Sequence, residues 1–583
     1  MFTIEEVSHI NTDVLIIGGG SAACRAAIEA FDCGASVTMI VKGLFGNSGC
    51  SLNVGTSASV GSWADPKDTN FTSMQDLISY GGYSGNQTLA KILVDETQDR
   101  INELISWGID FDRNEDNSIT VSYSAEHTYP RNVAFKDNST RKHSYGYPPG
   151  IAIMNTLLDQ VENRNIQVIQ NSALIKLVKD GADVVGGLAV NYESDKLLLI
   201  KSKTTILATG TYSQIFSKTS VSLEETGDGH AIGYHAGAEL IDMEVVNFVP
   251  SATGALPGAV FLNAKKEEFL HKHGINSLNN VTKEIFSAAI AQEIIDNGTE
   301  RDTIYVDMTE FFKNNDLNTD SDMKSTQQGS LLDIVIENIK TYGTVWSQIV
   351  SSVPQNIPDP AKDLLETTPA AHTTIGGIVV NEKGETAVPM LYAAGAVAGG
   401  IYGHARPEGY TSMIPLVYGK RAGKSAAEMS LRTKQKDIDF EKACSSKNLL
   451  NITDADTKKI KSEIRNIMYS HCWVIRDNHT LAKGLNKIQK IANDLSSSNG
   501  KTHKITPKKL LEIYEIKNML DCAEMMISGS LLRKETRGAF RRSDYPELDN
   551  ENWLKNLRYK KINGQLEIYP TEVDLKYCKP DNV

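Results

Sequence analysis

The chain has 583 residues and a formal net charge of −12, with 40% hydrophobic and 23% charged residues. This balance is typical of a multidomain globular protein with a sizeable core. An acidic chain without a long basic run argues against nucleic acid as a partner. There is no apolar run of 18 residues and no apolar segment near the N-terminus, so we expect neither a membrane span nor a signal peptide.

The seven cysteines are scattered, and no two of them form a C-x-x-C motif. The sequence therefore offers no zinc or iron–sulfur ligand set of its own, and no metal site is expected. An odd, unpatterned set of cysteines fits a reducing compartment, so we expect a cytoplasmic protein.

The first expected element is a buried strand at Val14–Ile17, followed by three glycines and a helix at Ala22–Phe31. The spacing Gly18-x-Gly20-x-x-Ala23 is the dinucleotide-binding fingerprint, with alanine in its third position. The glycines permit a tight turn and close approach of the backbone to a pyrophosphate, which would sit on the helix N-terminus. The predicted cofactor contacts here are Gly18, Gly20, Ser21, Ala22 and Ala23.

A second strand is expected at Ser36–Val41, and Lys42 follows where many dinucleotide folds carry an acid that binds ribose. The lysine argues against NAD as the nucleotide. The segment Gly43–Gly61 is rich in glycine and serine, so it either lines a flat isoalloxazine ring or is a flexible surface loop. The predicted cofactor contacts here are Lys42, Ser48, Gly49, Gly55 and Thr56.

Helices are expected at Asn86–Gly108 and Tyr147–Val161, and a β-meander between Ile166–Ile169 and Leu197–Leu207. The last strand runs into a small-residue turn that could pass near the adenosine or the pyrophosphate. Its predicted cofactor contacts are Ala208, Thr209 and Gly210.

Asp228 precedes a helix expected at His230–Ala238, and it either caps this helix or orients the flavin region. Residues 245–355 contain more Asn, Lys and Glu, with an amphipathic helix at about Val281–Asn297, and this predicts an inserted domain.

Glycine-rich sequence returns over His372–Gly423, which we expect to form the second half of the cofactor site. A helix at Thr411–Met429, opened by Thr411 or Ser412, would stabilise negative charge at the N1/C2 edge of a reduced flavin. The predicted contacts are Gly395, Ser412 and Ile414. Beyond about residue 431 the chain is lysine-rich and helical, and the tail after 545 predicts irregular structure with one strand at Gln565–Tyr569.

Several motifs together resemble the flavoprotein subunit family of succinate dehydrogenase and fumarate reductase, which includes L-aspartate oxidase and the adenylylsulfate reductase α subunit. These motifs are GGGSAA, ILATG, TGDG, HTTIGG, LYAAG, Arg406 and the C-terminal ETRGAFRRSDYP with DNENWLK. The resemblance implies FAD, an α/β Rossmann-like FAD-binding domain with an inserted α+β capping domain, a C-terminal helical domain, oligomer formation and an iron–sulfur partner subunit. The expected domains are FAD-binding (1–244 and 356–430), capping (245–355), helical (431–545) and tail (546–583).

Many members of this family bind FAD covalently through the histidine of a Ser-His-Thr triplet. The matching triplet here is Ser48-Gly49-Cys50, so non-covalent FAD is expected. Cys50 could replace the histidine as a thioether ligand, but a small buried cysteine is the ordinary interpretation.

By resemblance, His372 and Arg406 match the residues that hold a substrate carboxylate, a task that suits the arginine fork. A structural salt bridge and a structural histidine are the alternatives, and His404 is an extra acid–base candidate. The family's capping-domain histidine falls on Val249, and its acidic loop has no counterpart before Pro257–Asn263. The family's proton-donor arginine falls on Lys283, which could donate a proton or be an inert helix-start residue.

The leading hypothesis is an FAD-dependent oxidoreductase that transfers hydride between flavin N5 and a small anionic, dicarboxylate-like substrate, with electrons exchanged through an iron–sulfur partner. One alternative is a sulfur-compound enzyme like the adenylylsulfate reductase α subunit, favoured by FVP and PGAVFL but not by the retained HTTIGG. Further alternatives are an L-aspartate oxidase-like enzyme and a non-catalytic electron-transfer subunit.

Overall fold

The chain divides into two compact units. The first comprises Met1–Phe216, Val221–Asn247 and Thr373–Val583, and the second comprises Ser217–Ser220 and Phe248–His372. The computed structural model describes residues 7–54, 58–59, 65–136, 141, 143, 148–250, 259–278, 281–297, 303–310, 363–438, 456–497 and 506–581. The predicted domain boundaries stay predictions, and the one between 355 and 356 lies outside the described residues.

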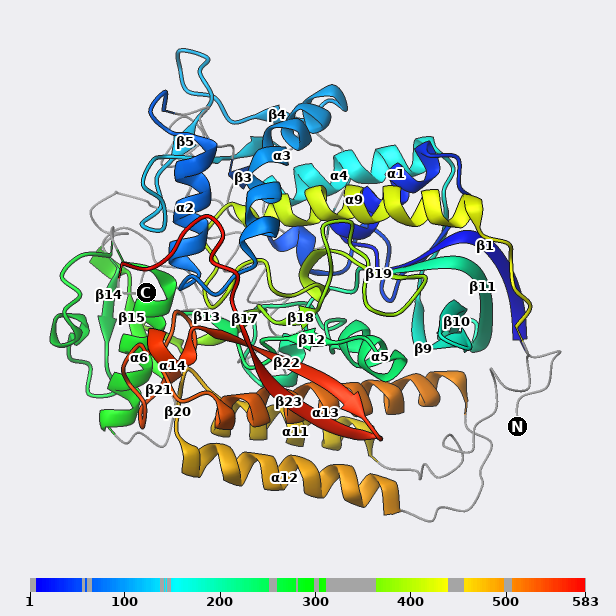
Figure 1. Ribbon diagram of the computed structural model, residues 1–583. Helices are drawn as coiled ribbons and strands as arrows, with labels where there is room; N and C mark the ends of the chain where they lie inside the picture. Colours follow the sequence, from blue (N-terminus) through cyan, green and yellow to red (C-terminus); the bar gives the residue numbers. More distant parts are fainter. Residues whose placement is uncertain are drawn as a thin grey trace. The chain divides into compact units, whose positions relative to one another are not determined.

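The first unit is built on a sheet in the order β8-β2-β1-β11-β10-β9, with β19 paired to β11 (Figure 1). Its strands are β1 (Val7–Ile17), β2 (Val37–Ile40), β8 (Gln167–Ile169), β9 (Ser172–Asp180), β10 (Asp183–Asn191), β11 (Lys196–Leu207) and β19 (Leu391–Ala393). The pairs β8–β2, β2–β1, β1–β11 and β11–β19 are parallel, whereas β9, β10 and β11 form an antiparallel meander. The carboxyl ends of β1 and β11 therefore meet at one sheet edge, where ligands of such folds bind.

Three helices lie side by side along this sheet: α1 (Ser21–Asp32), α4 (Pro148–Asn163) and α9 (Tyr410–Arg432) (Figure 1). Two glycines of α9 permit its close contact with α1. A Cβ atom on Gly419 would lie 2.7 Å from the Ala22 carbonyl oxygen, and one on Gly423 would lie 2.4 Å from that of Ala26. Since α9 packs this closely on α1, the second half of the predicted cofactor sequence lies against the first half.

Two helix starts differ from expectation. The helix α9 begins at Tyr410 after Gly409, whose φ of +81° favours glycine, so neither Thr411 nor Ser412 opens it. The helix α5 (Asp228–Ala236) follows Gly227 at φ +85° and has no side-chain cap, so the capping role for Asp228 is wrong.

The first unit contains further elements, several of which add residues to its core. They are α2 (Asn70–Tyr80), α3 (Gln87–Ser106), β3 (Ala58–Ser59), β4 (Asp110–Phe111), β5 (Val121–Ser122), β6 (Asn132–Val133), β7 (Phe135–Lys136), β20 (Ile475–Arg476), β21 (Arg541–Arg542) and α14 (Asn550–Trp553). The predicted helices at Asn86–Gly108, Tyr147–Val161 and Ala22–Phe31 match α3, α4 and α1 to within a few residues.

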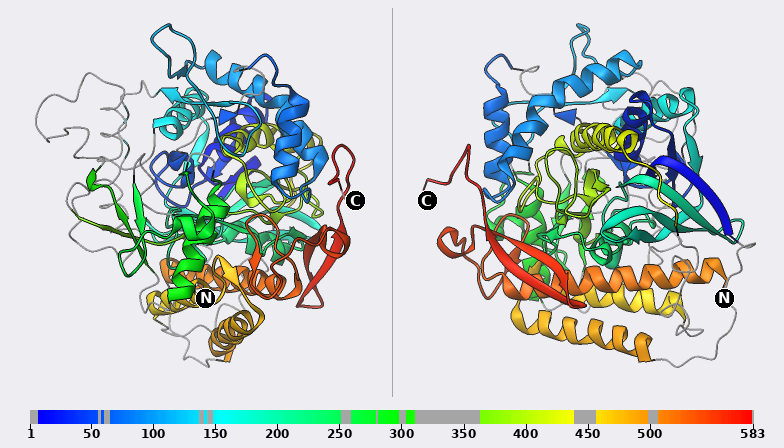
Figure 2. Two further views of the ribbon diagram at one scale, coloured as in Figure 1. Left: turned by 90° about the vertical axis from the view of Figure 1, so that its left-hand side faces the viewer. Right: turned by 45° about the vertical axis from the view of Figure 1, so that its right-hand side comes forward.

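The C-terminal part contains a helical bundle and a β-hairpin (Figure 2). The bundle consists of α11 (Thr457–His471), α12 (Asn478–Ser497) and α13 (Pro507–Leu532), as the lysine-rich helical sequence predicts. The hairpin, β22 (Lys555–Ile562) and β23 (Gln565–Glu572), extends the sheet β18-β12-β22-β23. The remaining strands of this sheet are β12 (Leu240–Ile241) and β18 (Gly377–Ile378). The expectation of an irregular tail with one strand is therefore wrong, because β22 pairs with both β12 and β23.

In its described residues, the second unit combines a small sheet with one α-helix. Its strands β14 (Val260–Leu262), β15 (Ile304–Asp307) and β16 (Leu365–Thr367) pair antiparallel, and its helix is α6 (Lys283–Asn297). The rings of Phe261 and Phe286 lie 4.8 Å apart and pack the helix onto the sheet. Two strands, β13 (Val246–Val249) and β17 (Ala370–Thr374), span the points where the chain passes between units. Nowhere in the described parts of the chain is there a helix with the length and apolar character needed to cross a membrane.

Candidate cofactor and substrate site

The dinucleotide fingerprint connects β1 to α1 by a turn that only glycine permits. Gly18 has φ +137°, and a Cβ there would lie 2.1 Å from the carbonyl oxygen of Ala208 at the end of β11. A Cβ on Gly20 would lie 2.8 Å from Oγ of Ser51, and this hydroxyl accepts a 3.0 Å hydrogen bond from the Ser21 nitrogen. The turn is therefore held closely between the carboxyl end of β11 and the loop after β2.

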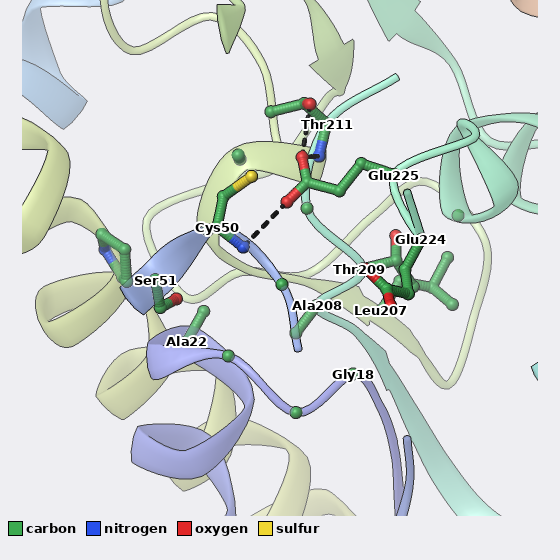
Figure 3. A pocket seen from close by; sticks show the side chains of 18 of the residues that line it. Gly18, Ala22, Cys50, Ser51, Leu207, Ala208, Thr209, Thr211, Glu224 and Glu225 are labelled. Carbon is green, nitrogen blue, oxygen red and sulfur yellow. Dashed lines mark hydrogen bonds between the residues drawn. The ribbon is translucent and has the colours of Figure 1, made fainter. Parts of the chain in front are cut away.

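A cavity opens at this turn within the first unit, and Figure 3 shows part of its wall. Most of the predicted cofactor residues line it: Gly18, Gly20, Ser21, Ala22, Lys42, Ser48, Gly49, Ala208, Thr209, Gly210, Asp228, Gly395 and Ile414. Gly55 and Thr56 lie outside the described residues. The fingerprint, the ATG turn and the glycine-rich segment around 395–415 thus meet at one place.

Two predicted contacts do not line the cavity. Ala23 is fully buried in α1, and a Cβ on Gly18 would lie 3.4 Å from its side chain, so it packs helix against strand. The Ser412 hydroxyl donates a 2.8 Å hydrogen bond to the Gly409 carbonyl and so stabilises the start of α9.

Several polar residues of the cavity wall are not among the predicted cofactor contacts. They are Ser51, Thr211, Glu224, Glu225, Thr373, Thr374, Tyr402 and Thr411, of which Thr411 is predicted only as a possible start of the flavin-facing helix. Each stands within a few residues of a recognised motif, and that proximity was the available signal: Thr211 follows the ATG turn and Glu225 precedes TGDG.

Lys42 and Asp228 form an ion pair in the cavity wall. The Lys42 ammonium nitrogen lies 2.7 Å from Asp228 Oδ2 and 2.6 Å from Glu515 Oε1 of α13. Burial alone would lower the pKa of Lys42, but the two carboxylates raise it above its ordinary value, so the lysine stays charged. Asp228 also accepts a 2.8 Å hydrogen bond from the Asn518 side chain. These contacts fix both predicted cofactor residues in place.

Cys50 is a half-buried thiol in the same wall. Its sulfur accepts a hydrogen bond from the Ser222 nitrogen at 3.3 Å. Burial, together with the nearby Glu225 carboxylate, raises the pKa of Cys50 well above its ordinary value. Since the thiolate is the nucleophilic form, this environment disfavours a thioether ligand. The thiol lines the cavity and is only half-buried, so it differs from the small buried cysteine of the ordinary interpretation.

Arg406 brings a second cation to the cavity. It is 6% exposed and lines the wall together with Tyr402 and Thr411. Burial raises the pKa of Tyr402 to about 12 despite the opposing charge of Arg406, so the phenol keeps its proton at neutral pH. The planar guanidinium of Arg406 makes it the group in the wall that is best suited to an anionic ligand.

His404 has a structural environment. It is fully buried, it is not part of the cavity wall, and its Nδ1 lies 2.6 Å from the Ser84 hydroxyl. Burial, with Arg533 and Arg537 nearby, lowers the pKa of His404 well below its ordinary value, so the ring is neutral. This placement does not suit an acid–base role in the cavity.

His404 also forms a compact buried group with Asp242 and Glu244, whose ligand atoms lie within 4.8 Å of one another. Arg533 already holds Glu244 at 2.8 Å, and the side chain of Asn556 donates to Asp242 at 2.7 Å. The carboxylates therefore have protein partners, and we assign this group to the fold.

The other two predicted catalytic residues belong to the second unit. His372 Nδ1 lies 2.7 Å from the Ser220 hydroxyl, which fixes the ring. Lys283 is the first residue of α6, and its ammonium nitrogen lies 3.8 Å from Glu284 Oε1. The catalytic roles of both residues stay predictions.

The cavity fits a dinucleotide cofactor in three respects. The N-terminus of α1 has glycine as its N-cap, without a side-chain cap, so backbone N–H groups are available to phosphate. The glycines of the fingerprint let the backbone approach a ligand closely. The buried Thr209 hydroxyl lines the cavity and has no hydrogen-bond partner among the described residues, as expected of a group that binds a ligand.

This fold and site define an α/β dinucleotide-binding protein. Residues 13–412 match the family model described as FAD binding domain, and residues 461–582 match the one described as fumarate reductase flavoprotein C-term. The chain belongs to the FAD-dependent family of succinate dehydrogenase and fumarate reductase flavoproteins. It is an FAD-dependent oxidoreductase, and the predicted fold class and cofactor are confirmed.

Similar proteins cover nearly the whole chain. An uncharacterized FAD-dependent oxidoreductase of Methanocaldococcus jannaschii is 31% identical over 94% of this chain and 96% of its own length. A subunit of the fumarate reductase (CoM/CoB) of Methanothermobacter marburgensis is 28% identical, with coverages of 94% and 96%. The solved structure of Mycobacterium smegmatis Sdh1 has a TM-score of 0.81 at 24% identity, covers 98% of this chain and 96% of its own, and shows the fold alone.

Proposed function

We propose that this flavoprotein transfers hydride between FAD and a carbon of a small dicarboxylate-like anion. The observation that carries the proposal is Arg406, a buried guanidinium in the wall of the cofactor cavity. Its planar fork suits bidentate binding of a carboxylate, and burial strengthens that contact relative to water. The similarity to a protein named as a fumarate reductase component supports a dicarboxylate over a sulfur compound.

The chain's own residues would bind and orient the substrate while FAD supplies a hydride acceptor or donor. In this proposal Arg406 holds one carboxylate. His372, whose ring is fixed by Ser220, would bind or polarise the other end. Lys283, the first residue of α6, would supply or take the substrate proton. Cys50 as a thiol supports non-covalent FAD.

We further propose that electrons are exchanged with an iron–sulfur partner. The sequence has no C-x-x-C motif, so a cluster would need ligands from another chain. The name of the Methanothermobacter relative, which designates one subunit of an enzyme, supports a protein that works with others.

Anaerobic flavin spectroscopy tests the substrate class. The purified holoenzyme is reduced chemically, and the return of oxidised-flavin absorbance is followed after fumarate is added. Rapid reoxidation supports the proposal. If fumarate has no effect while sulfite plus AMP reduces the oxidised enzyme, the sulfur chemistry is correct and the proposal is wrong. If L-aspartate reduces the oxidised enzyme and peroxide forms in air, the enzyme is an aspartate oxidase.

A further inference from the structure

Glu225 places a buried carboxylate in the wall of the FAD cavity. Its side chain is 5% exposed, and it precedes the first turn of α5. One oxygen accepts a 3.2 Å hydrogen bond from the Cys50 nitrogen, and the other accepts from the backbone nitrogen of Thr211 at 2.9 Å and from its hydroxyl (Figure 3). An ionised carboxylate is an acceptor only, and three donors directed at it are the arrangement that an ion requires.

The donors to Glu225 described above are neutral, which distinguishes it from Asp228 in the same wall. In the described part of the chain, no lysine or arginine nitrogen forms an ion pair within 4 Å of Glu225. Asp228, by contrast, pairs directly with Lys42. Backbone and hydroxyl dipoles stabilise the Glu225 charge without cancelling its field. The cavity therefore contains a negative charge that no cation of the described residues neutralises by direct contact.

Glu225 is hydrogen-bonded to Cys50, and both residues line the cavity, so the negative charge acts on a cofactor bound there. Cys50 lines the cavity and lies in the Gly43–Gly61 segment, for which lining of the isoalloxazine ring is one of the two sequence-based interpretations. Reduction of FAD by two electrons with uptake of one proton adds one negative charge to the ring. A nearby fixed negative charge in a poorly screened cavity opposes that change. We propose that Glu225 lowers the midpoint potential of the bound FAD, so that the reduced enzyme is a stronger electron donor.

This inference depends on FAD as the cofactor and not on the identity of the substrate. The Glu225 side chain has a second effect, which concerns the Cys50 thiol. Burial and the Glu225 carboxylate together keep Cys50 as a protonated thiol, so this thiol does not compete as a nucleophile beside the cofactor.

The test compares three variants of the holoenzyme. Glu225→Gln removes the charge, Glu225→Asp keeps it, and Glu224→Gln removes the charge of the neighbouring, more exposed wall residue. The midpoint potential of the flavin is measured by anaerobic reduction against a reference dye. We expect E225Q to raise the potential by at least about 30 mV, which is a tenfold change in the equilibrium constant of a two-electron couple. For E225D, we expect this equilibrium constant to stay within threefold of the parent's value. For E224Q, we expect a smaller shift of the midpoint potential than for E225Q.

An unchanged potential in E225Q would overturn the proposal. An equal shift in E225D and E225Q would also overturn it, because packing and not charge would then be the cause. If E225Q loses FAD, Glu225→Leu provides the same comparison with a different neutral side chain. The flavin spectrum before reduction verifies that each variant retains the cofactor.

Discussion

The ammonium nitrogen of Lys42 lies 2.7 Å from the Asp228 carboxylate, and this ion pair joins the loop after β2 to the first turn of α5. Glu515 of α13 binds the same lysine at 2.6 Å and also pairs with Lys461 of α11. These ion pairs therefore link the wall of the FAD cavity to helices α11 and α13 of the C-terminal bundle. Cofactor binding and bundle stability are therefore expected to depend on one another.

The acid stability of the protein should depend on Glu515. Burial alone would raise the pKa of Glu515, but Lys42 and Lys461 lower it to about 2 from an ordinary value of 4.5. Because the folded-state pKa is depressed, the ion pairs stabilise the fold above pH 4.5, and this contribution is lost as the pH falls towards 2. The thermal unfolding midpoint of the parent protein should therefore fall as the pH is lowered from 4.5 towards 2.

Glu515→Gln should lower the unfolding midpoint near neutral pH and flatten its fall in acid. The matched control is Glu572→Gln, whose partner Lys555 is 3.4 Å away and whose own side chain is 81% exposed. This control should follow the parent curve. If E515Q keeps the parent's acid slope, then Glu515 does not carry the pH dependence.

Gly18→Ala should abolish stable FAD binding. The added Cβ would lie 2.1 Å from the Ala208 carbonyl oxygen, so the turn between β1 and α1 would have to open. The matched control is Gly34→Ala, which also has positive φ, at +92°, but has nothing within 4 Å of the added atom. Both variants carry a backbone strain of roughly 1 kcal/mol, and only the first adds the collision.

Flavin content after gel filtration measures this difference. G18A should retain less than about a tenth of the parent's FAD per chain, whereas G34A should match the parent. Full flavin content in G18A would show that the turn does not contact the cofactor as closely as the fingerprint requires.

Arg533→Met should destabilise the first unit strongly. Arg533 is fully buried and binds Glu244 at 2.8 Å and Glu535 at 3.1 Å. Removal of the guanidinium leaves the buried Glu244 carboxylate without its cation, although Glu535 keeps Arg537 at 2.8 Å, and the loss costs about 3–5 kcal/mol. The control Lys555→Met removes a surface ion pair worth about 0–1 kcal/mol. Urea unfolding followed by fluorescence should give a lower midpoint for R533M than for K555M. Equal midpoints would contradict a structural role for the buried group of Asp242, Glu244 and His404.

Much of the cofactor site could be predicted from local sequence. The turn at Gly18, the strand that ends at Leu207 and the wall residue Asp228 all lie in motifs whose spacing reflects one backbone geometry. What local sequence cannot give is the partner of a charged side chain. Lys42 and Glu515 are 473 positions apart in the printed sequence, and only the fold brings them together.

The sequence also contains a signal for the hairpin of β22 and β23, beyond the one strand expected there. Asn563 and Gly564 have φ values of +51° and +84° and form a two-residue hairpin turn, which Asn-Gly between alternating apolar residues predicts. His404 is close in sequence to Arg406, but a neighbour along the chain need not share its cavity. The position of Glu225 directly before TGDG could have marked it as a wall residue, but its electrostatic role depends on which charges surround it in the fold.

The central claim is that Arg406 holds the substrate anion beside FAD. The most direct measurement is the rate of single-turnover reoxidation by fumarate of the anaerobically reduced enzyme, compared between the parent and Arg406→Lys. We expect R406K to retain FAD and its spectrum but to need at least about tenfold more fumarate for half-maximal rate, since lysine loses the bidentate fork. The control Arg421→Lys, at a half-buried surface pair with Glu96, should match the parent. An R406K enzyme with the parent's fumarate dependence would contradict the account.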